Sequence, residues 1–120
     1  MVAALIVDDD EPIRTMLAAI ARQHGFVVDT ASDGQEALDK LRSGHFDVVV
    51  LDLMMPRVNG YDVVHQIAAS DPGLLDHIIV ATAVPEREVR RQVTEPVFRV
   101  HIKPFEMRRL LDDMRLAAAS

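Results

Sequence analysis

Short runs of apolar, mostly β-branched residues alternate along the chain with segments whose apolar residues recur every three or four positions. Runs of four to eight apolar residues are typical of buried strands, and the longer spacing is typical of amphipathic helices. The five apolar runs span residues 3–8, 26–31, 47–52, 77–82 and 97–102. A segment with helical spacing follows each run, so the pattern predicts five strands and five helices in strict alternation.

The helical segments also carry signals for their ends. Before the first helix, Asp10 is predicted as the N-cap, and Pro12 suits the first helical turn. Ser32 and Gln35 form a possible capping box at the start of the second helix, which Gly44 would end. The other helical stretches are centred on residues 63–68, 86–93 and 110–114. The fourth of the five helices, over 86–93, has the weakest pattern.

Strict alternation of strands and helices implies a parallel sheet with helices on both faces. The run at 48–51 is apolar on both faces, as a central strand should be. We therefore predict one α/β domain over residues 1–120, with a doubly wound five-stranded parallel sheet and five helices. Ligands of such sheets bind beyond the carboxyl ends of the strands. The polar residues predicted to converge there are Asp8, Asp9, Asp52, Thr82 and Lys103.

These side chains suit phosphoryl chemistry around a hard cation. Asp8, Asp9 and Asp52 supply the oxygen ligands that Mg²⁺ prefers, although four acidic residues at 8–11 could also form a solvated acidic turn. Lys103 supplies a compact positive charge for a phosphoryl oxygen, and Thr82 supplies a hydroxyl donor. An aspartate carboxylate can attack phosphorus when a metal and a cation neutralise the oxygen charge.

The composition narrows the class of protein without identifying it. Hydrophobic residues make up 49% of the chain, charged residues 27%, and cysteine is absent, which excludes disulfide and thiol chemistry. The net charge of -6 argues against direct contact with nucleic acid through phosphate neutralisation. Because the sequence has neither a signal-peptide pattern nor an apolar run long enough to cross a membrane, we expect a cytoplasmic domain without membrane contact.

Four motifs, in order and at matching spacing, carry a resemblance to a known family. They are "IVDDDEPIR" at the first strand, "DVVVLDLMMPRVNGYDV" around Asp52, "ATA" around Thr82 and "KPF" starting at Lys103. Thr82 lies thirty residues after Asp52. Across essentially its whole length, the chain resembles the receiver domain of two-component response regulators. One motif alone would be weak support, whereas four in order are specific.

The resemblance implies a flavodoxin-like strand order, 2-1-3-4-5, and specific roles for the residues. Asp52 would accept a phosphoryl group from the phosphohistidine of a sensor histidine kinase or phosphotransfer protein. Asp9, Asp52 and the backbone carbonyl of Met54 would bind Mg²⁺ directly, and Asp8 would act through metal-bound water. Lys103 would contact the phosphoryl oxygen, with a cis peptide bond before the following proline.

Thr82 would move toward the phosphate and reshape the face formed by the fourth helix, fifth strand and fifth helix, which would bind a downstream effector. A phosphorylation-dependent homodimer through this face is left open. The domain would not be an enzyme for other substrates, since it would catalyse only its own phosphorylation and autodephosphorylation. It would not itself contact nucleic acid. We expect no output domain within the 120 residues, which could be a single-domain regulator or one part of a longer chain.

The sequence departs from the family near its fifth strand. Receivers commonly carry a tyrosine or phenylalanine three residues before the lysine, and this switch position is Val100 here. Phe98 is predicted on the same strand face, one pleat away. We hypothesise that phosphorylation is read without an aromatic rotamer switch. Met54 and Val84 are apolar where the family's residues border the phosphate, which predicts a long-lived phosphoryl group.

Three alternatives differ in class. A pseudo-receiver, which binds proteins without being phosphorylated, is suggested by the degenerate fifth-strand segment and opposed by the intact set of Asp52, Thr82 and Lys103. An Mg²⁺-dependent phosphohydrolase would need a second catalytic acid and a substrate pocket. A flavin carrier of the same fold class would need a phosphate-cradling loop where this chain has carboxylates.

Overall fold

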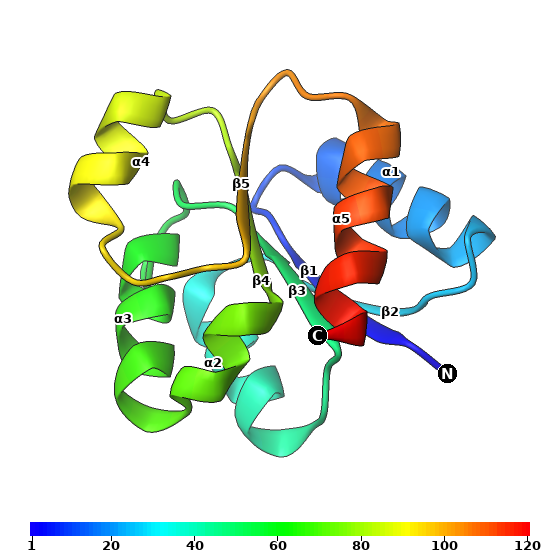
Figure 1. Cartoon of the computed structure of the whole chain (residues 1–120), viewed down its shortest axis with the longest axis horizontal. Helices are drawn as coiled ribbons and strands as arrows, with labels where there is room; N and C mark the ends of the chain where they lie inside the picture. Colours follow the sequence, from blue (N-terminus) through cyan, green and yellow to red (C-terminus); the bar gives the residue numbers. More distant parts are fainter.

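Five parallel strands form the middle layer of the molecule in the computed structural model, which describes residues 1–120 (Figure 1). The strands are β1 (Ala3–Val7), β2 (Val27–Ala31), β3 (Val48–Leu51), β4 (Ile78–Thr82) and β5 (Arg99–Ile102). Their order across the sheet is β2-β1-β3-β4-β5. The predicted fold class and strand order are therefore confirmed, and each predicted strand proves shorter by one or two residues.

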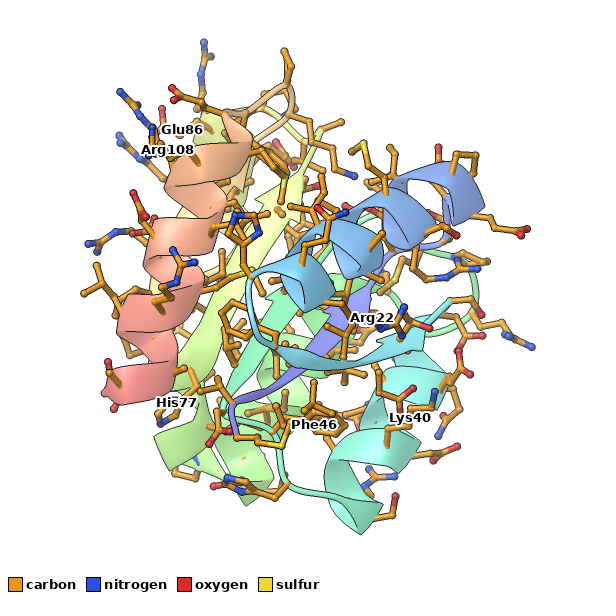
Figure 2. The ribbon with its side chains drawn as sticks, turned by 90° about the vertical axis from the view of Figure 1, so that its right-hand side faces the viewer. Arg22, Lys40, Phe46, His77, Glu86 and Arg108 are labelled. Atoms are coloured by element: carbon orange, nitrogen blue, oxygen red, sulfur yellow. The ribbon has the colours of Figure 1, made fainter.

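Helices cover both faces of the sheet. They are α1 (Glu11–Gln23), α2 (Gly34–Ser43), α3 (Gly60–Ser70), α4 (Glu86–Gln92) and α5 (Met107–Ala119). Helices α1 and α5 lie over one face, as Figure 2 shows, and α2, α3 and α4 pack on the other. A short 3₁₀ helix, η1 (Pro72–His77), was not predicted, because its proline and glycine are typical of a turn.

Alternation along the central strands divides the core in two. Leu5, Val49 and Leu51 face the cluster that includes α2, α3 and α4, whereas Ile6 and Val50 face the cluster formed with α1 and α5. All four residues of β3 are buried, which confirms the prediction of a central strand apolar on both faces. This double-sided packing holds the strands in place, and the strand ends carry the polar residues.

Helix capping follows the prediction at α1 and departs from it at α2. The carboxylate of Asp10 accepts the backbone N–H of Ile13, as an N-cap does. At α2 the cap is Asp33 rather than Ser32. Asp33 accepts the N–H of Glu36 at 2.8 Å, and Glu36 accepts the N–H of Ser32 at 2.6 Å. The predicted box is thus shifted by one residue, with Asp33 and Glu36 in the places predicted for Ser32 and Gln35.

The predicted position of Phe98 is wrong. The N–H of Phe98 donates to the carbonyl of Ile78 at 2.9 Å, but strand β5 begins only at Arg99. Alternation breaks at this step, because Phe98 and Arg99 both lie on the side of α1 and α5. Its ring packs against the core cluster of α1 and α5, with the guanidinium carbon of Arg99 4.9 Å from the ring centroid. Val100 pairs with Val80, which belongs to the opposite cluster. Phe98 therefore does not stand in for the missing aromatic residue at Val100.

Candidate functional site

The carboxyl-terminal edge of the sheet holds the site residues in register. Asp8 directly follows β1, Asp52 follows β3 and Lys103 follows β5, while Thr82 is the last residue of β4. Each of the first three donates its backbone N–H to the neighbouring strand. The acceptors are the carbonyl oxygens of Ala31 for Asp8, Val7 for Asp52 and Thr82 for Lys103, at 3.1, 3.0 and 2.8 Å. The parallel ladder therefore continues into the site.

An ammonium group lies between two buried carboxylates at this edge. Nζ of Lys103 is 2.7 Å from Oδ2 of Asp8 and 3.4 Å from Oδ2 of Asp52. Burial alone would lower the pKa of Lys103. The hydrogen bond to Asp8 and the charges of both carboxylates outweigh burial, so its pKa is raised above the ordinary value. Lys103 therefore remains positively charged throughout the neutral range.

The two carboxylates are held differently. Asp8 accepts the backbone N–H of Asp10 at 2.9 Å through Oδ1, in addition to the short contact from Lys103. Asp52 accepts only long hydrogen bonds, at 3.3 Å from the N–H of Met54 and 3.4 Å from Lys103. Hydrogen bonds of that length are weak. The carboxylate of Asp52 is therefore held less firmly than that of Asp8.

A third carboxylate completes an oxygen-rich cluster. One oxygen each from Asp8, Asp9 and Asp52 lies within 4.8 Å of the others. Asp8 and Asp52 are buried, and Asp9 is exposed on the solvent side. Three carboxylates face a single ammonium group, and such crowding of like charge is relieved by a cation. Oxygen donors open to water on one side suit Mg²⁺, which keeps several water ligands.

The residues of the expected switch lie on β4 and β5. Thr82 is completely buried, and its hydroxyl oxygen accepts the N–H of Val84 at 3.3 Å. Val84 is buried in the core on the α2, α3 and α4 side, away from solvent. Val100, at the position where the family commonly carries an aromatic residue, is 38% exposed. The peptide bond between Lys103 and Pro104 is cis, as expected.

Gly60 allows α3 to begin directly beneath Asp52. A Cβ atom at this position would lie 2.2 Å from the carbonyl oxygen of Asp52 and 2.6 Å from Cα of Leu53. The N–H of Gly60 donates to the carbonyl of Leu53 at 3.0 Å. Only glycine permits this approach, which closes the base of the β3–α3 loop (residues 52–59).

Sequence reasoning missed a second set of residues around this loop. Asp33 at the start of α2 forms an ion pair with Arg57 in the loop, and the N–H of Gly34 donates to the carbonyl of Val58 at 2.9 Å. The Asp-Gly pair at 33–34 signals a turn or helix start. Its partners lie 24 residues away in sequence, and no spacing rule predicts such a contact.

The fold and the acidic edge of the sheet are those of a known family of signalling domains. The family model described as "Response regulator receiver domain" matches residues 4–115, and the chain belongs to this family of two-component signalling domains. Response regulator MprA of Mycolicibacterium vanbaalenii is 38% identical over 121 residues, covering 95% of this chain and 49% of the relative. The probable transcriptional regulatory protein TcrX of Mycobacterium tuberculosis is 40% identical over 73 residues, 61% of this chain and 31% of that protein. The chain spans about half the length of MprA.

Solved structures agree with this assignment. The response regulator TrrA of Thermotoga maritima, crystallised in complex with Mg²⁺-BeF, superposes with a TM-score of 0.85 at 31% identity, covering 98% of this chain and 99% of that one. A CheY-like receiver domain protein of Methanospirillum hungatei superposes with a TM-score of 0.90 at 23% identity, covering 99% of this chain and 94% of that one. At this identity the similarity shows the fold alone. None of the helices in this chain is long and apolar enough to cross a membrane.

Proposed function

We propose that the domain accepts a phosphoryl group on Asp52 from the phosphohistidine of a sensor histidine kinase or phosphotransfer protein, in a reaction that requires Mg²⁺. The observation that carries the proposal is the loosely held carboxylate of Asp52 beside Lys103 and two further carboxylates. An oxygen of Asp52 forms a bond to phosphorus as the phosphorus–nitrogen bond breaks. The imidazole nitrogen leaves with the electron pair and is protonated by solvent.

Asp9, Asp52 and the backbone carbonyl of Met54 would hold Mg²⁺, and Asp8 would bind it through water. When bound, the ion neutralises negative charge that collects on the phosphoryl oxygens. Lys103 exchanges part of its contact with the carboxylates for a phosphoryl oxygen, and its raised pKa keeps it charged while it does so. The pseudo-receiver alternative gains no support from a site in which all these groups are present and adjacent.

The phosphodonor must approach the edge of the sheet that holds Asp52. An apolar groove of about 510 Å³ opens beside Lys103, between α1 and the start of α5. Its apolar lining consists of Ile13, Met16, Leu17, Ile20, Phe105 and Met107. We infer that the donor protein rests against this groove while its phosphohistidine reaches the carboxylates, since apolar contacts supply affinity and the charged edge supplies orientation.

The phosphorylated state would be read on the face of α4, β5 and α5. Thr82 turns its hydroxyl from Val84 toward the phosphoryl group, and α4 follows the change in the β4–α4 segment. Because Val100 has no ring to change rotamer, the effector or a second receiver would recognise the altered backbone and α4. The domain acts in the cytoplasm, does not itself contact nucleic acid, and hydrolyses only its own acyl phosphate.

The test is intact mass spectrometry after incubation with a small phosphodonor, such as phosphoramidate, and Mg²⁺. We expect a gain of one phosphoryl group in the wild-type chain, loss of that gain with EDTA, and none in Asp52→Asn. A wild-type chain that gains no mass under these conditions, while remaining folded, would contradict the proposal and favour a pseudo-receiver. A gain that persists in Asp52→Asn would place the modification on another residue.

A further inference from the structure

The β3–α3 loop is fastened at more than its two ends. Its first residue, Asp52, continues the ladder of β3, and Gly60 closes its base at the other end. Between these points Arg57 adopts a φ of 62°, the left-handed region that residues other than glycine rarely adopt. A loop residue in such a conformation has to be held there by its surroundings. The surroundings of Arg57 come from α2.

The amino end of α2 lies directly against this loop. A Cβ atom at Gly34 would lie 2.0 Å from the carbonyl oxygen of Val58, so only glycine allows the contact. The N–H of Gly34 donates to the same carbonyl at 2.9 Å. One backbone hydrogen bond therefore joins α2 to the loop immediately after Arg57.

Asp33 adds a charged contact at the same point. Its side chain is only 4% exposed, and one oxygen accepts the N–H of Glu36 as the cap of α2. The other oxygen accepts from Nη2 of Arg57. The Arg57 side chain is otherwise 72% exposed. A buried carboxylate is costly without a compensating partner, so the loop is drawn to α2 by the need to neutralise Asp33.

We propose that Asp33 and Arg57 are a positioning pair that orders the β3–α3 loop for cation binding. The inference rests on the proposed function, in which Asp52 and the carbonyl of Met54 at the start of this loop hold Mg²⁺. Without the pair, the loop samples more conformations, and Mg²⁺ binding has to order it. Affinity for Mg²⁺ falls, whereas the chemistry at saturating Mg²⁺ is preserved because no reacting atom is removed.

Arg57→Asn is the informative variant, because asparagine tolerates a positive φ and removes the positive charge without adding the backbone freedom of glycine. Arg42→Ala is the matched control, since Arg42 is an exposed arginine of α2 that does not contact the loop. Arg57→Lys keeps the positive charge at this position and serves as the conservative variant. The Mg²⁺ dissociation constant is measured by titration of ¹⁵N-labelled protein, and the phosphorylation rate by intact mass with phosphoramidate.

We expect Arg57→Asn to weaken Mg²⁺ binding by roughly three- to tenfold, with the phosphorylation rate at saturating Mg²⁺ within about twofold of wild type. Arg57→Lys should recover most of the affinity, and Arg42→Ala should match wild type. If Arg57→Asn binds Mg²⁺ as tightly as the wild-type chain does, the positioning pair is refuted. The proposed function still stands in that case, provided that the wild-type chain is phosphorylated on Asp52. If the wild-type chain binds no Mg²⁺, both fail.

Discussion

Replacing Lys103 with methionine removes the ammonium group that contacts both Asp8 and Asp52 and keeps an unbranched side chain. The buried carboxylate of Asp8 then loses its 2.7 Å partner, and Asp52 loses its contact at 3.4 Å. Breaking a fully buried pair costs about 3–5 kcal/mol. Because the Lys103 side chain is 18% exposed, water can partly replace it, and we expect a loss of about 2–3 kcal/mol in the absence of divalent cations.

Mg²⁺ should offset part of this loss, since a cation among Asp8, Asp9 and Asp52 takes over the neutralising role of the ammonium group. A ligand at 100 times its dissociation constant stabilises the folded state by about 2.7 kcal/mol. We therefore expect the gain in stability on adding Mg²⁺ to be larger in Lys103→Met than in wild type. Urea unfolding in EDTA and in saturating Mg²⁺ measures both quantities, and the thermal midpoint should fall by roughly 8–12 °C in EDTA.

Lys40→Met is the matched control, because Lys40 is the only other lysine of the chain. It lies on α2 and is labelled in Figure 2, and its partners Asp29 and Glu36 have side chains 53% and 42% exposed. Exposed pairs contribute about 0–1 kcal/mol, so this variant should differ little from wild type. If Lys103→Met unfolds at the same urea concentration as Lys40→Met in EDTA, the reasoning about the buried charges is refuted.

Three further predictions test separate features. Gly60→Ala should destabilise the fold by about 2–4 kcal/mol in thermal unfolding, because the added methyl group overlaps the backbone, and a cost below that of Gly44→Ala would contradict this. The hydrogen bond from the N–H of Ala3 lowers the pKa of Asp47. Above pH 5, the free energy of unfolding of wild type should therefore exceed that of Asp47→Asn by up to about 1 kcal/mol. The difference should vanish as pH falls through the lowered pKa, and melting curves from pH 3 to 7 can check this. Met54→Asn should shorten the lifetime of the phosphoryl group severalfold by placing a polar amide where water attacks, and an unchanged decay of the phosphorylated mass would argue against that view.

Residue patterns predicted the fold well because they report burial directly. The run VVVL at 48–51 is apolar on both faces only because helices cover both sides of β3. The contact between Lys103 and Asp8 spans 95 residues, yet it was predictable, because parallel strands bring their carboxyl ends to one edge. Strand ends were less certain, since their last residues are fixed by hydrogen bonds that apolarity does not record.

The contacts that sequence reasoning missed depend on local geometry between loops. The pair of Asp33 and Arg57 needs a left-handed residue, a helix cap and a glycine contact to coincide. None of these has a periodic signal. The position of Phe98 was wrong for a related reason, because alternation assumes a regular strand and the chain is irregular at the step from Phe98 to Arg99.

The site residues Asp8, Asp52 and Lys103 each donate a backbone N–H to the next strand, and these hydrogen bonds limit how readily the backbone beneath the site opens. Their amide hydrogens can exchange with solvent only when the end of the sheet itself opens, although their side chains meet at the rim of the molecule. The arrangement places a slowly opening backbone beneath side chains that meet at the rim. Receiver loops can therefore diverge to suit different partners without disturbing the spacing of the carboxylates and the lysine.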